Sequence, residues 1–284
     1  MISFNNIGNL GRLANQMFQY ASLKGIAKNR GYEFSIPPEN VFGQNDPLVK
    51  NDKLNIYDVF GIDKTNNVRI VQNPMLQERM HEFDEELFRS CPDNVDLFGY
   101  FQSPKYFNHI SDEIKSDFTF TEEVDKLCSE MFDSIEGDKV IALHIRRTDY
   151  TKNPNHPLQP MEYYENALKH FDKSDRILVF SDDPKWCQEQ ELFADDIIMI
   201  SEGNDADIDL CLMSKCNYHI IANSSFSWWS AWLNNNTEKT VYYPEVWFGP
   251  AKNDFDTKDL IPESWIKVES NKIKKFFTFN LKII

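Results

Sequence analysis

Two adjacent arginines follow a short apolar segment in the middle of the chain. Residues 139–145 read as a buried strand, and the sequence HIRRTDY at residues 144–150 places Arg146 and Arg147 just beyond it. A guanidinium group is planar, stays protonated and pairs well with phosphate oxygens. The alternative is a surface arginine pair with one carboxylate partner, such as Asp149. The position directly after a strand favours phosphate binding.

A cluster of small polar residues stands at the start of an expected helix, where residues 223–229 read NSSFSWW. Backbone N–H groups are unpaired at a helix start, and the helix dipole adds partial positive charge there. Asn223, Ser224 and Ser225 are therefore a second candidate for phosphate binding. The alternative is a plain capping segment before a core helix, and we favour that core role for the tryptophans at 228, 229 and 232.

Two acids follow the apolar run at residues 176–180 and precede a proline. Aspartate before proline is usual at a helix start, where the carboxylate caps backbone N–H groups. We expect Asp183 to cap the helix. Capping and ligand contact are equally good interpretations for Asp182.

A glycine-containing turn at residues 8–16 lies between the first expected strand and the first expected helix. It is not a GxGxxG motif, so its glycines, Gly11 among them, are a weak signal on their own. Asn15 and Gln16 are suited to hydrogen-bond a sugar or a phosphate, and equally suited to cap the turn.

The second half of the chain alternates between apolar runs and amphipathic segments. Such alternation indicates right-handed βαβ units and a parallel sheet covered on both faces. Ligands of such sheets bind beyond the carboxyl ends of the strands, where the polar segments above fall. The expected strands are 139–145, 176–180, 196–200, 218–222 and 240–243, and the expected helices are 160–171, 184–193, 205–216 and 225–234.

The first half is less regular, and residues 37–95, rich in Asn, Asp and Pro, suggest no assignment. Elements are expected elsewhere: strands at 2–5, 32–36 and 98–101, and helices at 13–29 and 122–134. Residues 135–138 are the expected hinge. We therefore predict two lobes, 1–136 and 137–284, with the last helix as a candidate to pack back on the first lobe.

Charge and composition limit the classes of partner. The net charge of −15 disfavours nucleic acid. Five cysteines without a CxxC pair suggest a reducing compartment. The start has no signal-peptide pattern, and no run approaches the ~18 apolar residues of a membrane span. We expect a cytoplasmic protein. The basic and aromatic tail at 272–284 suggests a last packed element or, as an alternative, a weak peripheral contact with the inner face of the membrane.

Metal binding is not expected. Asp205, Asp207 and Asp209 contain a DxD pattern, but they fall at the start of an expected helix, where acids favour the dipole. The six histidines show no ligand spacing.

Four blocks in a fixed order resemble the bacterial α-1,2-fucosyltransferases of glycosyltransferase family 11. These blocks are GRLANQMFQYA, HIRRTDY, FSDD and IANSSFSWWSAWL, and GYFQSPKYF at residues 99–107 is also similar to that family. The resemblance covers residues 6–270. One departure is visible: the usual N-terminal pattern is GGLGNQ, and Ala14 stands here in place of a glycine.

The resemblance implies an α/β fold of the GT-B type, with two Rossmann-like lobes that face a central cleft. The first lobe would mainly bind the acceptor and the second GDP-fucose. Arg146 would contact the β-phosphate, His144 would lie near the nucleotide, and Asp209 would bind guanine. Ser224, Ser225 and Phe226 would lie at the phosphates. Gly11, Arg147, Asp182 and Asn223 complete the expected donor site, together with Asn15 and Gln16.

The implied reaction is metal-independent and inverts the anomeric centre. It transfers L-fucose from GDP-fucose to the 2-hydroxyl of a terminal β-galactoside, in the synthesis of a surface polysaccharide. No resident cofactor is expected. A general base is required, and Asp149 is one candidate, although it is equally placed to hold Arg146 or Arg147. The alternatives are a transferase with another donor or linkage, and an inactive sugar- or nucleotide-binding protein.

Overall fold

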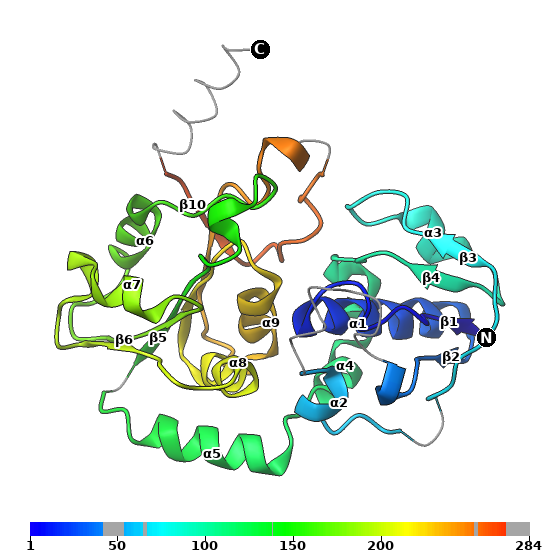
Figure 1. The fold of residues 1–284 in the computed structure, drawn as a ribbon, viewed down its shortest axis with the longest axis horizontal. Coiled ribbons are helices and arrows are strands. Elements are labelled where there is room, and N and C mark those ends of the chain that lie inside the picture. Colours follow the sequence, from blue (N-terminus) through cyan, green and yellow to red (C-terminus); the bar gives the residue numbers. More distant parts are fainter. Residues whose placement is uncertain (42–53, 65–66, 138, 253–254, 271–284) are drawn as a thin grey trace. The chain divides into compact units, whose positions relative to one another are not determined.

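The computed structural model describes residues 1–41, 54–64, 67–137, 139–252 and 255–270. The chain forms two compact units, and each is an α/β unit with a parallel sheet (Figure 1). Unit 1 comprises Met1–Glu122 with Phe255–Pro262, and unit 2 comprises Glu123–Asp254 with Glu263–Ile284.

Unit 1 is built on a four-stranded sheet of order β2-β1-β4-β3, in which all pairings are parallel. Its strands are short: β1 (Ile2–Ser3), β2 (Phe34–Ser35), β3 (Met75–Gln77) and β4 (Asp96–Phe98). Its helices are α1 (Leu13–Arg30), α2 (Ile56–Val59), α3 (Glu85–Ser90) and α4 (Ser111–Asp117).

Helix α1 is the central element of unit 1, since most of its side chains are buried. It ends at Gly31, whose left-handed φ of 68° lets its N–H bond back to carbonyls of the last turn. Gly25 allows a close approach to the 3-10 turn Pro104–Tyr106. A Cβ added at Gly25 would lie 2.0 Å from the carbonyl oxygen of Tyr106.

Unit 2 is built on a six-stranded parallel sheet of order β10-β9-β8-β5-β6-β7. The strands are β5 (Val140–Ile145), β6 (Arg176–Ser181), β7 (Ile198–Ile200), β8 (Tyr218–Ile220), β9 (Val241–Pro244) and β10 (Ile266–Val268). The helices are α5 (Glu122–Asp133), α6 (Met161–Leu168), α7 (Pro184–Gln188), α8 (Ala206–Lys215) and α9 (Ser225–Leu233).

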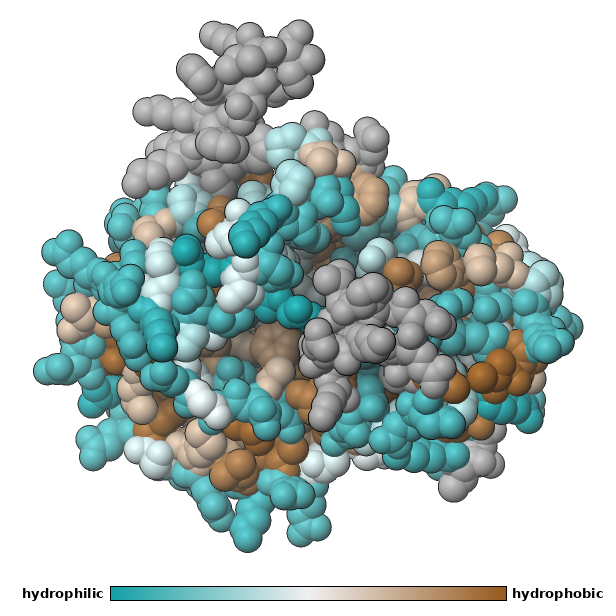
Figure 2. Space-filling model, in the orientation of Figure 1, coloured by the Kyte–Doolittle hydropathy of each residue, from teal (hydrophilic) through white to brown (hydrophobic). Residues whose placement is uncertain are grey.

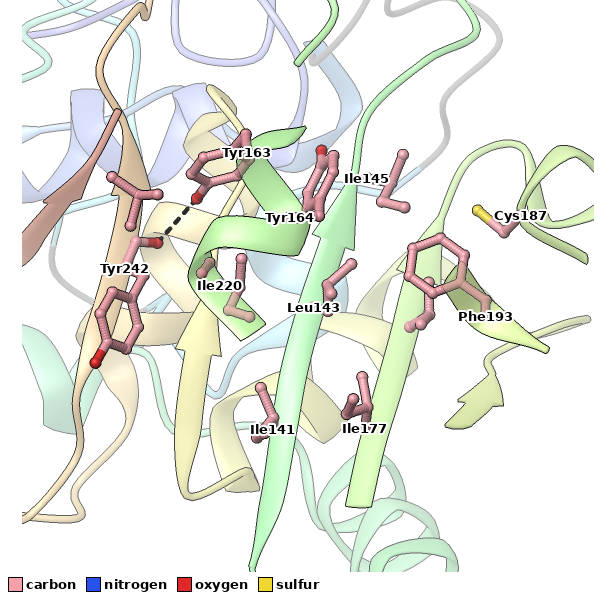
Figure 3. Close-up of a cluster of buried hydrophobic side chains, with 13 residues drawn as sticks. Ile141, Leu143, Ile145, Tyr163, Tyr164, Ile177, Cys187, Phe193, Ile220 and Tyr242 are labelled. Carbon is pink, nitrogen blue, oxygen red and sulfur yellow. Dashed lines mark hydrogen bonds between the residues drawn. The ribbon is translucent and has the colours of Figure 1, made fainter. Parts of the chain in front are cut away.

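Side-chain alternation along β5 separates two faces of this sheet. Ile141, Leu143 and Ile145 point to the side of α6, where they pack with its two tyrosines (Figure 3). The hydroxyl of Tyr163 shares its one proton between the carbonyl oxygens of Ile221, at 2.6 Å, and Tyr242, at 3.2 Å. His144 has the opposite parity and meets α9 on the other face.

Most elements of unit 2 agree with the expectation within a few residues, and two segments of the chain, one in each unit, differ. The strand expected at 98–101 is β4, which ends at Phe98, because Gly99 and Phe101 have φ values of 155° and 51°. The helix that begins at Pro184 ends at Gln188, and a 3-10 turn follows at Glu191–Phe193. The unassigned stretch at 37–95 contains α2, β3 and α3, and β10 was not expected.

The division between the units falls earlier than the expected boundary at residue 136. Helix α5 belongs to unit 2 because it packs on α8: the Cys128 thiol lies 3.6 Å from the Ile208 carbonyl, and Lys215 pairs with Asp125 at 2.7 Å. The segment that returns to unit 1 is Phe255–Pro262. The expected last helix lies in residues 271–284, outside the described residues.

The surface in Figure 2 is mainly hydrophilic, in keeping with the net charge of −15. Large hydrophobic side chains exposed among the described residues include Met75, Leu127 and Met199, on different elements. Single exposed apolar residues are ordinary on protein surfaces and indicate no binding face by themselves.

Candidate active site

Arg146 directly follows β5 at the carboxyl edge of the unit 2 sheet, held between two carboxylates. Its guanidinium pairs with Asp149 at 2.7 Å and with Asp182 at 3.3 Å. It also lies over the Tyr150 ring, 5.6 Å from the centroid. The side chain is 17% exposed, whereas that of Asp149 is 47% exposed. Asp149 therefore holds Arg146, which is one of its two expected roles. The carboxylate of Asp149 also remains accessible to a ligand.

Arg147 is turned to a different set of partners. Its guanidinium stacks on the Trp186 ring of α7 at 3.6 Å and pairs with Asp183 at 3.2 Å. Asp183 also accepts a hydrogen bond from the N–H of Trp186, so its expected capping role is confirmed. Contact of Arg147 with a ligand stays a prediction. In this structure, Arg147 holds the loop that follows β5 against α7.

Asp182 fixes the loop that carries both arginines. Its carboxylate accepts hydrogen bonds from the N–H groups of Arg147, at 2.8 Å, and Thr148, at 3.1 Å, and from the Thr148 hydroxyl. Burial raises the pKa of Asp182, but Arg146 and these hydrogen bonds outweigh burial and lower the pKa overall. Asp182 therefore orients Arg146, and its contact with a ligand stays a prediction.

The N-terminus of α9 is linked to Arg146 through Tyr150. Ser224 is the N-cap residue, and its hydroxyl accepts a hydrogen bond from the N–H of Phe226 at 3.3 Å. The side-chain amide of Asn223 donates to the carbonyls of Pro157, at 3.1 Å, and Trp247, at 2.9 Å.

Tyr150 connects the two halves of this site, because its hydroxyl donates to the Asn223 carbonyl at 3.0 Å while its ring lies under Arg146. A guanidinium and a helix N-terminus therefore stand together. This combination is well suited to bind an anion.

His144 lies beneath this edge, between β5 and α9. Its Nδ1 atom is 2.9 Å from the Ser227 hydroxyl, and its ring is 5.8 Å from that of Phe226. Burial, with a smaller contribution from Arg146, lowers the pKa of His144 to about 3. The imidazole is therefore neutral at neutral pH.

Asp209 is placed on α8, on the side of the loop that follows β7. Its carboxylate accepts hydrogen bonds from the Ser201 hydroxyl at 2.7 Å and the Asn204 amide at 3.2 Å. Burial raises its pKa above the ordinary value. Its expected contact with guanine stays a prediction.

The turn before α1 belongs to unit 1 and is described within that unit. Gly11 has a φ of 85°, and a Cβ there would lie 2.1 Å from the Asn15 amide. Asn15 accepts a hydrogen bond from Gln102 at 2.7 Å. Gln16 is fully buried, and its side-chain oxygen accepts the N–H of Ile56 at 3.2 Å, while its expected contact with a ligand stays a prediction. Gln16 therefore braces the start of α2.

The model of glycosyl transferase family 11 matches residues 1–269. The chain belongs to this family. It is 33% identical to an α-1,2-colitosyltransferase of Escherichia coli, over 91% of this chain and 97% of that protein. It is 34% identical to the Escherichia coli O-antigen biosynthesis glycosyltransferase WbnK, over 71% and 70%. A galactoside α-(1,2)-fucosyltransferase 2 of Sus scrofa is 26% identical, over 93% and 80%.

Two solved structures share the fold of this family 11 glycosyltransferase at low sequence identity. One is the fucosyltransferase NodZ from Bradyrhizobium, with 14% identity, a TM-score of 0.51, and coverage of 81% of this chain and 91% of that one. The other is POFUT1 in complex with GDP, with 11% identity, a TM-score of 0.53, and coverage of 85% and 97%. The likeness and the two parallel sheets confirm the α/β fold of the GT-B type.

The sequence analysis gave no role to three residues that lie near the expected sites. Tyr150 and Ser227 lie inside the HIRRTDY and NSSFSWW segments, but tertiary contacts alone reveal their roles. Glu78 follows β3 in unit 1 and accepts the N–H groups of Tyr100, at 2.7 Å, and Phe101, at 2.9 Å. Burial raises the pKa of Glu78 to about 7. No local pattern marks this acid.

Within the described residues, no group of three or more His, Cys, Asp or Glu side chains is arranged to hold a metal ion. The same part of the chain contains no helix with the length and apolar character that a membrane crossing requires. Metal independence and peripheral membrane contact remain predictions for this family 11 enzyme.

Proposed function

We propose that this family 11 glycosyltransferase transfers L-fucose from GDP-fucose to the 2-hydroxyl of a terminal β-galactoside, with inversion. The placement of Arg146 beside the N-terminus of α9 carries the donor part of this proposal, because two positive groups meet where a diphosphate would bind. The names of the Escherichia coli and Sus scrofa relatives support the linkage and a role in O-antigen synthesis.

The proposed chemistry follows from the charge that develops in the reaction. When the bond between C1 of the sugar and the phosphate oxygen breaks, negative charge grows on the β-phosphate and the sugar becomes oxocarbenium-like. Arg146 and the partial positive charge at the N-terminus of α9 would stabilise that charge, a role that a metal ion fills in other transferases. Reaction without a metal is therefore part of the proposal.

The two carboxylates that hold Arg146 would have different fates when a diphosphate binds. Asp182 is 18% exposed and is tied to the loop by three further hydrogen bonds, so it would stay. Asp149 is 47% exposed and would be displaced by the phosphate. A released carboxylate beside the donor would suit the general base that the acceptor hydroxyl requires. Asp149→Asn would then lower kcat more than it raises the KM for the donor.

A second donor is favoured by one specific observation, the 33% identity to an α-1,2-colitosyltransferase over nearly the whole chain. Colitose is L-fucose without its 3-hydroxyl. A site with a buried partner for that hydroxyl would reject the deoxy sugar strongly, by up to ~10⁴-fold, whereas an apolar site would discriminate only weakly. The ratio of kcat/KM for GDP-fucose and GDP-colitose therefore decides between the two donors.

The proposed place of action is the cytoplasm, at the inner face of the membrane where surface polysaccharide is assembled. All five cysteines are buried free thiols, which suits a reducing compartment. Fractionation of the producing cells would test this.

The test of function is a mass-spectrometric transfer assay of the full chain in EDTA. GDP-fucose, GDP-colitose, GDP-mannose and UDP-galactose would each be offered with lactose and a panel of β-galactosides. A fucosylated product supports the donor, the acceptor class and metal independence together. Product from another donor alone would refute the fucosyl proposal. If no donor reacts with any acceptor and GDP still binds in calorimetry, the protein is a nucleotide-binding protein.

A further inference from the structure

The histidine beneath the arginine loop has a defined neighbour on α9. His144 is buried, and Nδ1 is the ring nitrogen with a hydrogen-bond partner among the described residues. That partner is the hydroxyl of Ser227, at 2.9 Å. Ser227 is fully buried in the first turns of α9, so the contact is shielded from water.

The hydroxyl of Ser227 has a second contact, which limits where the protons can be. Its oxygen lies 3.4 Å from the carbonyl oxygen of Ser224, and a carbonyl can only accept a hydrogen bond. The hydroxyl has a single proton. Both contacts are hydrogen bonds in one arrangement: Ser227 donates to Ser224, and His144 donates from Nδ1–H to Ser227. In a neutral ring, Nε2 then carries a lone pair.

The charge state of the ring agrees with this arrangement. Burial and the nearby Arg146 lower the pKa of His144 to about 3, so protonation of Nε2 at neutral pH is strongly disfavoured. Such a weak base is poorly suited to remove a proton from an acceptor hydroxyl. It remains a good hydrogen-bond acceptor.

His144 lies at the same edge of the sheet as the arginine loop. His144 lies two residues before Arg146 at the carboxyl end of β5, next to the N-terminal turn of α9. We propose that Ser227 is a positioning residue that holds His144 as the Nδ1–H tautomer, so that Nε2 accepts a hydrogen bond from a hydroxyl or N–H group of the bound nucleotide sugar. This rests on the proposed nucleotide-sugar donor.

Histidine-selective ¹⁵N labelling of the full chain tests the tautomer directly. Long-range ¹H–¹⁵N spectra between pH 6 and 8 should show His144, assigned by the loss of its signals in His144→Gln, as one neutral Nδ1–H tautomer. Addition of GDP or GDP-fucose should shift the Nε2 resonance. In Ser227→Ala, the ring should become a mixture of tautomers, and Kd for the same ligand should rise roughly three- to tenfold.

Ser230→Ala is the matched control. Ser230 is a buried serine of the same helix, and its hydroxyl donates to the Ser227 carbonyl at 2.8 Å, away from the imidazole. This variant should leave the His144 spectrum and Kd unchanged. Equal loss of affinity in both serine variants would mean that α9 packing, and not the tautomer, controls binding.

The remaining outcomes separate the two proposals. An Nε2–H tautomer or an imidazolium ion in the wild-type protein would overturn the inference, even if Ser227→Ala fails to fold. An unchanged tautomer in Ser227→Ala, or no response of Nε2 to GDP and GDP-fucose when both bind, would also overturn it. Failure of the wild type to bind either nucleotide would refute the proposed donor, whereas the apo spectrum would still report the tautomer.

Discussion

Asp182→Asn should destabilise unit 2 and reduce catalysis, because this carboxylate receives four donors from three consecutive residues. One oxygen accepts the N–H of Arg147, and the other accepts the N–H and hydroxyl of Thr148 and pairs with Arg146. An asparagine keeps one acceptor oxygen and turns an NH₂ group toward the donors of the other. At least one backbone N–H therefore loses its partner.

The magnitude follows from these contacts. The N–H of Arg147 is partly buried and that of Thr148 is exposed, so the loss of one acceptor costs about 1 kcal/mol, the low end of the range for an unsatisfied N–H group. The ion pair with Arg146, between side chains that are 17% and 18% exposed, adds about 1 kcal/mol. The expected loss is about 2 kcal/mol, which corresponds to a fall in Tm of roughly 4–8 °C for a domain of this size. Because Arg146 also loses its fixed orientation, we expect kcat/KM to fall by at least about tenfold.

Urea unfolding monitored by tryptophan fluorescence is the direct assay, since all six tryptophans of the chain belong to unit 2. Asp183→Asn is the matched control, because asparagine also caps helices and its partner Arg147 keeps the stack on Trp186. That variant should lose less than about 1 kcal/mol. If Asp182→Asn were as stable as the control, the carboxylate would not be organising the loop.

Three further predictions concern other parts of the molecule. Arg146→Ala should lower kcat/KM about 100- to 1,000-fold with folding retained, and transfer near the wild-type rate would refute its phosphate role. The pKa of His219 is lowered to about 3 by burial, so the stability from its neutral ring is full above pH 6.5 and is lost as the pH falls toward 3. The difference in unfolding free energy between wild type and His219→Gln should therefore shrink by roughly 2 kcal/mol from pH 7.5 to pH 5, and a difference independent of pH would contradict this. Gly25→Ala should destabilise unit 1 by about 1–3 kcal/mol in calorimetry, because the new methyl meets the Tyr106 carbonyl. Gly61→Ala, with open space around it, should not.

The fold of unit 2 was largely predictable because its central strands are buried on both faces and read as apolar runs. β5 and β6 are examples, with almost every side chain buried. In unit 1, β3 at the sheet edge exposes Met75 and Gln77, and β4 contains Asp96, which accepts hydrogen bonds from Ser3 and Asn5. Neither strand forms an apolar run in the sequence. The hydrophobic pattern alone therefore could not define where β3 and β4 begin and end.

The candidate site also has features that the sequence predicts and contacts that it does not predict. Arg146 and the start of α9 were predictable because their types and positions after strands are local properties. The partners of Asp182, Gln16 and Ser227 were not, since each contact joins segments more than 30 residues apart. The division of the compact units after Glu122 also has a nonlocal cause, the packing of α5 on α8.

The return of Phe255–Pro262 to unit 1 has a consequence for synthesis of the chain. Asp259 is buried there: it pairs with Lys105, accepts the N–H of Phe83 at 3.2 Å, and its carbonyl accepts the Ser103 hydroxyl at 2.7 Å. During translation, residues 1–122 leave the ribosome long before Asp259 is synthesised. Unit 1 therefore stays incomplete until nearly all of unit 2 has been made. A fragment that ends at residue 122 would keep three donors without their acceptor, and separate expression of this unit would require the later segment to be fused back.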